Sequence, residues 1–133
     1  MPSHDDSGIS GNAILIRAIH PDWVVTEGDG SRLSSASFVT GALEASCFIA
    51  DEVGGIEGFI RDILPELSSE LGMDFRVATL SVAAARARGL CVCRKPHEYK
   101  DNPAHVVICA SDGMTKSSYK RRARELADDA TLL

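Results

Sequence analysis

Apolar residues between Gly54 and Gly72 recur with the period of an α-helix. They fall three or four positions apart and so predict one amphipathic stripe: Ile56, Phe59, Ile60, Ile63, Leu64, Leu67 and Leu71. Pro65 lies inside this stripe, which keeps its phase across the proline. We therefore expect a kinked helix that ends at Gly72.

Two further segments have helical patterns. The alanine-rich run 82–88 follows Thr79, a candidate cap, and Gly89 is its expected stop. From about Lys116 onward, apolar residues again share one helical face, with Tyr119 among them.

The remaining apolar runs are short and rich in residues that favour strands. The first should end at His20, because Pro21 lacks the N–H that a strand ladder needs. The predicted strands are residues 13–19, 23–25, 32–39, 45–50, 90–94 and 104–110.

Strands in runs and helices in groups predict an α+β fold, a single domain whose sheet is mixed or antiparallel and carries about three helices. Residues 1–12 are polar and glycine-rich, so we expect a flexible N-terminal tail followed by a single domain over residues 13–133. One core is expected to unite the sheet with the kinked helix and with the alanine face of the next helix: Phe38, Phe48, Ile49, Val107 and Ile108 against Ile60, Ile63 and Leu67.

The length of 133 residues and the 44% hydrophobic content suit one compact domain and argue against disorder. The apolar runs are too short to span a membrane, and the first residues carry His4, Asp5 and Asp6 where a signal peptide would be basic and then apolar. The sequence thus favours a cytoplasmic protein with no membrane partner.

The net charge of −5 is divided unevenly along the chain. Residues 1–75 hold 13 acidic and 3 basic side chains, whereas residues 76–133 hold 6 acidic and 11 basic ones. Either the two halves attract each other within the fold, or the basic residues form a face for a phosphorylated ligand or an acidic partner. That face would comprise Arg86, Arg88, Arg94, Lys95, Lys116, Lys120, Arg121, Arg122 and Arg124.

Four cysteines without an export signal indicate reduced thiols. Cys91 and Cys93 flank Val92 and would share one strand face, within reach of Cys109, His97 and His105. Zinc modules usually use C-x2-C pairs, which are absent, so we expect core thiols, no metal and no cofactor.

Polar residues interrupt the strands and suggest a site. Histidine suits acid and base catalysis, and arginine can hold a phosphate or carboxylate through two hydrogen bonds. The candidate catalytic residues are His20 and His105, and the candidate substrate-binding residues are Arg17, Arg32, Ser34 and Ser35. The alternative is that the histidines bond nearby backbone and the arginines are solvated.

A second candidate is the segment 111–118, where a strand leads through a loop into a helix. Free backbone donors at a helix start attract anions, and Lys116 and Ser117 would add to the attraction. The segment is not a P-loop, because Ala110 and Thr115 occupy the two glycine positions of that motif.

Three short motifs carry a resemblance. His20-Pro21-x-Trp23, Arg32-x-Ser34-Ser35-x-x-Phe38 and Asn102-Pro103-Ala104-His105 resemble a set of small bacterial proteins of uncharacterised activity, which implies a bacterial origin. Leu15-Ile16-Arg17 and Arg32-x-Ser34-Ser35 are also similar to ADP-ribosyltransferase-like toxin domains, in which an early arginine and a later serine handle a dinucleotide.

Two functional hypotheses follow. The first is a small bacterial enzyme that acts on a phosphate-bearing substrate, a nucleotide or an RNA end, with Arg32 holding the anion while His20 and His105 exchange protons. The second is a non-catalytic accessory or antitoxin-like module that binds a protein partner through its charged halves.

Overall fold

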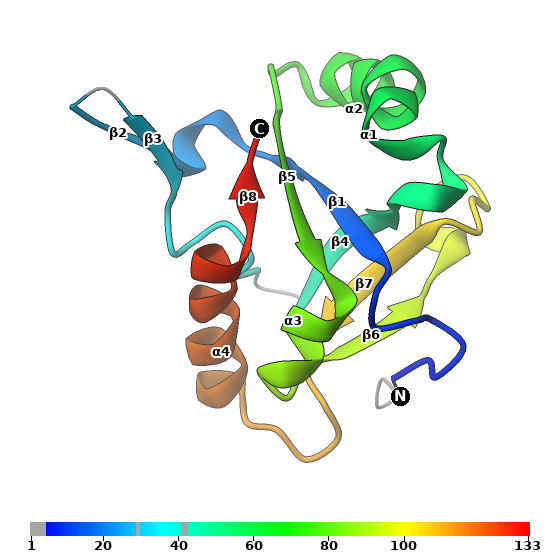
Figure 1. Cartoon of the computed structure of the whole chain (residues 1–133), viewed down its shortest axis with the longest axis vertical. Coiled ribbons are helices and arrows are strands. Elements are labelled where there is room, and N and C mark those ends of the chain that lie inside the picture. The colour runs from blue at the N-terminus through cyan, green and yellow to red at the C-terminus, as the bar shows by residue number, and fades with distance from the viewer. Residues whose placement is uncertain (1–4, 29, 41–42) are drawn as a thin grey trace.

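An antiparallel sheet forms the centre of the molecule (Figure 1). The computed structural model describes residues 5–28, 30–40 and 43–133. In spatial order, the strands of this sheet are β6 (Cys91–Arg94), β7 (His105–Cys109), β4 (Glu44–Ile49), β1 (Ile14–Ile19), β5 (Arg76–Ser81) and β8 (Thr131–Leu132). Each neighbouring pair runs antiparallel, so the predicted α+β class is confirmed and the sheet is of the antiparallel kind.

A helical segment over residues 55–71 crosses one face of the sheet. It consists of α1 (Gly55–Gly58), a π-helical turn (Phe59–Ile63) and α2 (Leu64–Leu71). The predicted disturbance takes the form of this widened turn, which ends at Ile63, two residues before Pro65 and its missing N–H. Gly72 ends the helix with φ +64°, as expected for a glycine stop.

Two more helices complete the fold. α3 (Val82–Ala87) is capped by Ser81, whose side chain accepts from the Ala84 N–H. The prediction of Thr79 as the cap is wrong, because Thr79 lies within β5. α4 (Lys116–Asp129) is capped by Thr115 in the same manner as α3 and leads into β8.

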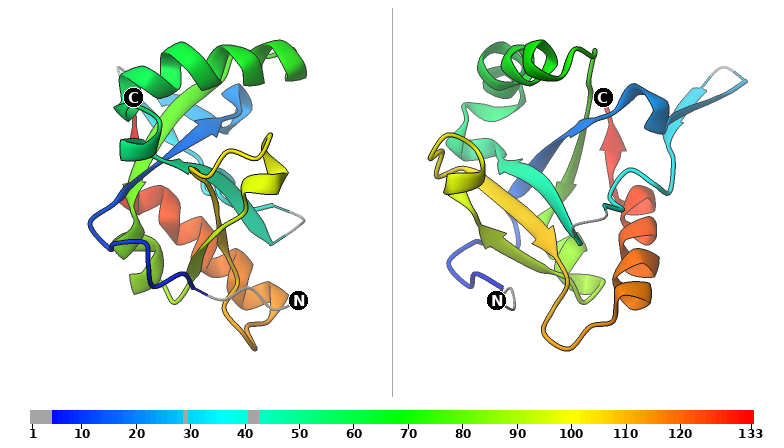
Figure 2. Two further views of the ribbon diagram at one scale, coloured as in Figure 1. Left: turned by 90° about the vertical axis from the view of Figure 1, so that its right-hand side faces the viewer. Right: turned by 180° about the vertical axis from the view of Figure 1, so that it is seen from behind.

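The sheet carries a separate apolar cluster on each face. The 55–71 segment and α4 lie on opposite sides of the sheet (Figure 2). Phe48 packs with Phe59 and Ile63 of the 55–71 segment, whereas Ile49 packs on the opposite face with Tyr119 and its neighbours from α3 and α4. The single core expected from the sequence is therefore wrong. Adjacent strand residues point to opposite faces, so Phe48 and Ile49 cannot contact the same helix.

Two predicted strands have other bounds in the structure and lie outside the main sheet. β2 (Val24–Glu27) and β3 (Gly30–Leu33) form a hairpin outside the main sheet, and the strand expected over residues 32–39 ends at Leu33. Ser34 starts a turn, because its Oγ accepts from the Ala36 N–H and its carbonyl accepts from Ser37 Oγ. Such local bonds compete with strand pairing.

The described part of the expected tail, residues 5–12, is in contact with the domain. The Asp6 N–H donates to the Val92 carbonyl (2.9 Å), Asp5 accepts from the Val92 N–H, and Ile9 is buried. Residues 1–4 lie outside the described residues. In the described ranges, no helix is long and apolar enough to cross a membrane.

Candidate functional site

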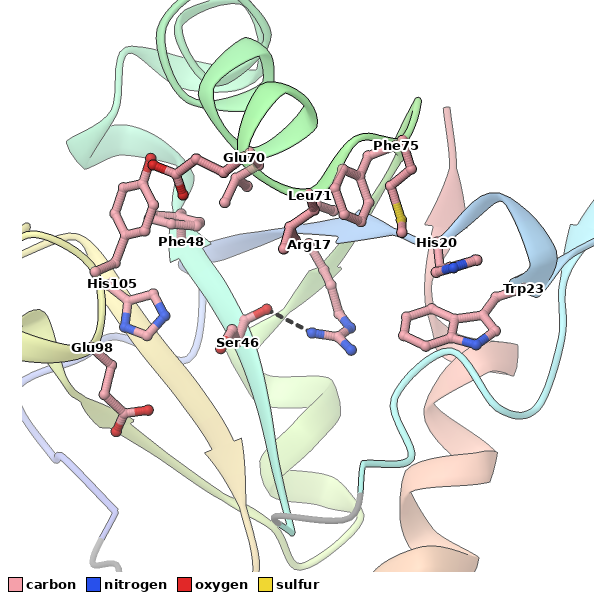
Figure 3. A pocket seen from close by; sticks show the side chains of 14 residues that line it. Arg17, His20, Trp23, Ser46, Phe48, Glu70, Leu71, Phe75, Glu98 and His105 are labelled. Atoms are coloured by element: carbon pink, nitrogen blue, oxygen red, sulfur yellow. Dashed lines mark hydrogen bonds between the residues drawn. The ribbon is translucent and has the colours of Figure 1, made fainter.

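A pocket of about 490 Å³ lies between the 55–71 segment and the centre of the sheet (Figure 3). Its wall is mostly apolar and aromatic with a few polar groups, the composition typical of small-molecule sites. The lining residues are Arg17, Ala18, His20, Trp23, Ser46, Phe48, Leu67, Glu70, Leu71, Met73, Phe75, Glu98, Tyr99 and His105.

The floor of the pocket is a split between β1 and β4. These strands pair only at Leu15 with Ile49 and Ile16 with Phe48, whereas β1 pairs with β5 along six positions. Beyond Ile16 the side chain of Arg17 takes the place of the missing ladder, and its Nη1 donates to the Ser46 carbonyl at 2.9 Å. The opening between the strands is therefore occupied by a guanidinium group.

Arg17 is a buried cation, only 6% exposed. Its Nε donates to the Ser37 carbonyl (2.9 Å), and its Cζ lies 5.5 Å from the ring centroid of Trp23 and 5.6 Å from that of Phe38. Among the described residues, no carboxylate pairs with it. Burial lowers the pKa of Arg17, an effect that the neighbouring Cys47 and Tyr119 oppose.

Both carboxylates in the pocket lining already have cationic partners. Glu70 pairs with Lys100 at 2.9 Å, and Glu98 lies 3.5 Å from Lys95. Within the described ranges, the partners of the Arg17 guanidinium are thus backbone carbonyls and aromatic rings. Burying a charge without a counter-ion costs free energy, so an anion that binds in this pocket beside Arg17 would offset part of that cost.

His105 is buried at the start of β7, and a backbone group orients its ring. Nδ1 lies 2.7 Å from the Lys95 carbonyl, which can only accept, so Nδ1 carries the hydrogen. In the neutral ring Nε2 is then a hydrogen-bond acceptor. Phe48 and Tyr99 pack against the imidazole with centroid distances of 5.2 and 6.2 Å.

His20 has the opposite arrangement. It caps the 3-10 helix Pro21–Trp23, where its Nδ1 accepts from the Asp22 N–H at 3.0 Å, and its ring lies 5.6 Å from that of Trp23. With Nδ1 as acceptor, the neutral ring carries its hydrogen on Nε2 and donates there. Both histidines therefore bond nearby backbone, as the alternative interpretation of the sequence expected, and each keeps a second nitrogen for other partners.

Figure 3 shows His105 and His20 on opposite sides of Arg17. The pocket thus combines a cation, a ring nitrogen that accepts and a ring nitrogen that donates. Such a set can bind an anion and move protons on either side of it.

Tyr99 stands beside His105 in the wall, and its hydroxyl is buried without a hydrogen-bond partner among the described atoms. Burial raises the pKa of Tyr99, and the charge of Glu66 adds to this effect. Tyr99 therefore contributes a neutral aromatic surface to the pocket.

The structure places the other predicted residues elsewhere. Arg32 and Ser35 line a separate, smaller depression beside Arg124 of α4, because β3 belongs to the outlying hairpin. Arg32 therefore does not line the pocket that contains the two histidines, whereas Arg17 does. Ser34 serves the turn after β3.

Lys116 and Ser117 are exposed in the first turn of α4 and do not line the pocket. Sequence reasoning missed the aromatic wall, chiefly Trp23 and Tyr99. Trp23 could have been found from its place three residues after His20. Tyr99 lies in a polar loop and carries no such signal.

Much of the charge division is explained by pairing within the fold. Arg86 binds Asp5 at 3.1 Å and Arg94 binds Glu52 at 2.8 Å. In the same way, Lys95 binds Glu44, and Lys100 binds Glu66 and Glu70. These bases of the second half are therefore not a free surface for an acidic partner.

The cysteines are thiols outside any disulfide, with Cys47 and Cys109 buried and Cys91 and Cys93 partly buried. Within the part of the chain that the structure describes, no three His, Cys, Asp or Glu side chains gather in a way that could hold a metal ion. His97, which the sequence predicts within reach of the thiols, is exposed and bonds Asp101 at 2.7 Å.

Comparisons with protein-family models, with curated proteins and with solved structures find no match to this chain.

Proposed function

We propose that the protein is an enzyme that acts on a nucleotide, with Arg17 holding a phosphate while His105 and His20 exchange protons with the substrate. The observation that carries this proposal is the buried guanidinium of Arg17, which has no carboxylate partner in the described structure. It lines the same pocket as two histidines whose Nδ1 atoms have opposite hydrogen-bond roles.

The shape and composition of the pocket favour a planar, partly apolar ligand as well as an anion. Rings of Trp23, Phe48, Phe75 and Tyr99 line it, and a volume near 490 Å³ suits a small molecule. A nucleotide offers both parts, because its base can stack on aromatic side chains while its phosphate meets the arginine.

The chemistry would be displacement at phosphorus. His105 Nε2 takes a proton from an attacking water or hydroxyl, whose oxygen forms a bond to phosphorus. The bond from phosphorus to the leaving oxygen breaks, and that oxygen receives a proton from His20 Nε2. Arg17 offsets the negative charge that builds up on the phosphoryl oxygens.

The protein-binding alternative has less support, because several of the charges that suggested it are paired within the chain.

An RNA end would place its terminal nucleotide in the pocket and leave the rest of the strand outside. Free nucleotides and short RNA strands can therefore be compared as substrates in one assay.

Calorimetric titration with adenosine 5′-monophosphate, adenosine and inorganic phosphate tests the binding step. We expect the monophosphate to bind at least tenfold more tightly than adenosine, because only the monophosphate reaches Arg17 with a charge. Equal affinity for both, or binding of neither, would contradict the proposal.

Turnover is tested by following 2′,3′-cyclic AMP and short oligoribonucleotides by ³¹P NMR. His20→Ala and His105→Gln should each lower the rate by about 10²- to 10⁴-fold. His97→Ala is the matched control, because His97 is exposed and lies outside the pocket. If the three variants react alike, the histidines of the pocket are not acid and base.

A further inference from the structure

The β6–β7 ladder brings two thiols into contact. Cys93 Sγ lies 3.1 Å from Cys109 Sγ, about 1 Å longer than a disulfide bond. Cys91 is directly opposite Cys109, and Cys93 is directly opposite Val107, so the thiol contact runs diagonally across the two strands. Val92 and Ile108 point to the other face, into the cluster with α3 and α4.

The two members of this pair differ in access. Cys93 is partly exposed, whereas Cys109 is 1% exposed. A small oxidant from solvent can therefore reach Cys93, and the oxidised Cys93 sulfur would lie in contact with the Cys109 sulfur. This is the arrangement of a thiol that reacts with an oxidant and a resolving thiol buried beside it.

We propose that Cys93 and Cys109 form an oxidation site that a hydroperoxide closes into an intramolecular disulfide. The Cys93 thiolate attacks the terminal peroxide oxygen, the O–O bond breaks, and Cys93 becomes a sulfenic acid while the peroxide leaves as water or an alcohol. Cys109 then attacks the Cys93 sulfur, the S–O bond breaks and water leaves. Two thiols are oxidised and one peroxide is reduced.

The other two thiols are less suited to this chemistry. Cys47 is fully buried in the cluster on the opposite face of the sheet, and burial raises its pKa to about 12. Cys91 contributes its carbonyl, not its thiol, to the contact with Cys109 Sγ, at 3.7 Å. Burial, followed by the charge of Asp5, raises the pKa of Cys91 as well.

The test treats the reduced full-length protein with equimolar hydrogen peroxide, blocks free thiols with iodoacetamide in denaturant, and measures intact and peptide masses. We expect a loss of 2 Da, alkylation of Cys47 and Cys91 only, and a cross-linked peptide joining Cys93 to Cys109. The reaction does not depend on nucleotide binding, so its result is separate from that of the proposed function.

Three variants identify the pair. Cys93→Ser and Cys109→Ser should each abolish the 2 Da loss, whereas Cys91→Ser, which removes a partly buried thiol from the same strand face, should keep it. Cys93 is partly exposed, so its variant tests the proposal even if Cys109→Ser fails to fold. A disulfide from Cys91 to Cys109, a cross-link between chains, or peroxide treatment that leaves all four thiols reduced would overturn the proposal.

Discussion

Arg17→Met separates a ligand-binding role of this residue from a structural one. The variant loses two charge-assisted hydrogen bonds, from Nε to Ser37 and from Nη1 to Ser46, each worth about 1.5–3 kcal/mol. Against this loss stands the relief of burying an ion that has no described counter-charge, which is worth roughly several kcal/mol. Methionine also keeps the apolar contacts with Trp23 and Phe38.

Because these terms oppose each other, we expect the free energy of unfolding to change by less than about 2 kcal/mol. The affinity for adenosine 5′-monophosphate should fall much further. Losing one partner of a buried charged pair costs about 2–5 kcal/mol, or roughly 30- to 4000-fold in the dissociation constant.

Urea unfolding followed by circular dichroism measures the first quantity, and calorimetric titration measures the second. Arg32→Met is a suitable control, since Arg32 lies outside the pocket. The reasoning is refuted if Arg17→Met costs more than about 4 kcal/mol of stability while the remaining folded protein binds the nucleotide as before.

Three further predictions concern stability. Ile63→Ala should cost about 2–5 kcal/mol in urea unfolding, because Ile63 is buried between the 55–71 segment and the sheet. Ile60→Ala, at a 45% exposed position, should cost only about 0.5 kcal/mol, and equal losses would contradict the assigned helix face. Gly58→Ala should destabilise by about 1–3 kcal/mol, since its Cβ would lie 2.0 Å from the Val53 carbonyl oxygen; a higher melting temperature would show that the backbone there can move. The free energy of unfolding should decline above pH 9, because the Cys47 thiol has a pKa of about 12 in the folded chain and about 9 in the unfolded chain. In the same assay, Cys47→Ala should show a shallower decline between pH 9 and 11. An unchanged slope would contradict the raised pKa.

The class of fold can be predicted from sequence, because local signals agree with the structure over most elements. The stripe of the 55–71 segment, the glycine stop at Gly72 and the apolar runs of β1, β4 and β7 follow from side-chain period and backbone chemistry. The sequence also indicated His20, His105 and Arg17, because polar side chains in apolar strands are unusual.

Which of these residues lie close together depends on long-range packing. Arg17 and Arg32 look alike in the sequence, each a cation in a strand-like run. One lies in the split of the central sheet and the other on an outlying hairpin, because β1 pairs with a strand distant in sequence whereas β3 pairs only with its neighbour β2. The contact of Cys93 with Cys109 depends on the register of β6 and β7, which local preference does not specify. Periodicity tells which side of an element is buried, whereas the partner on that side is chosen by the packing of the whole chain.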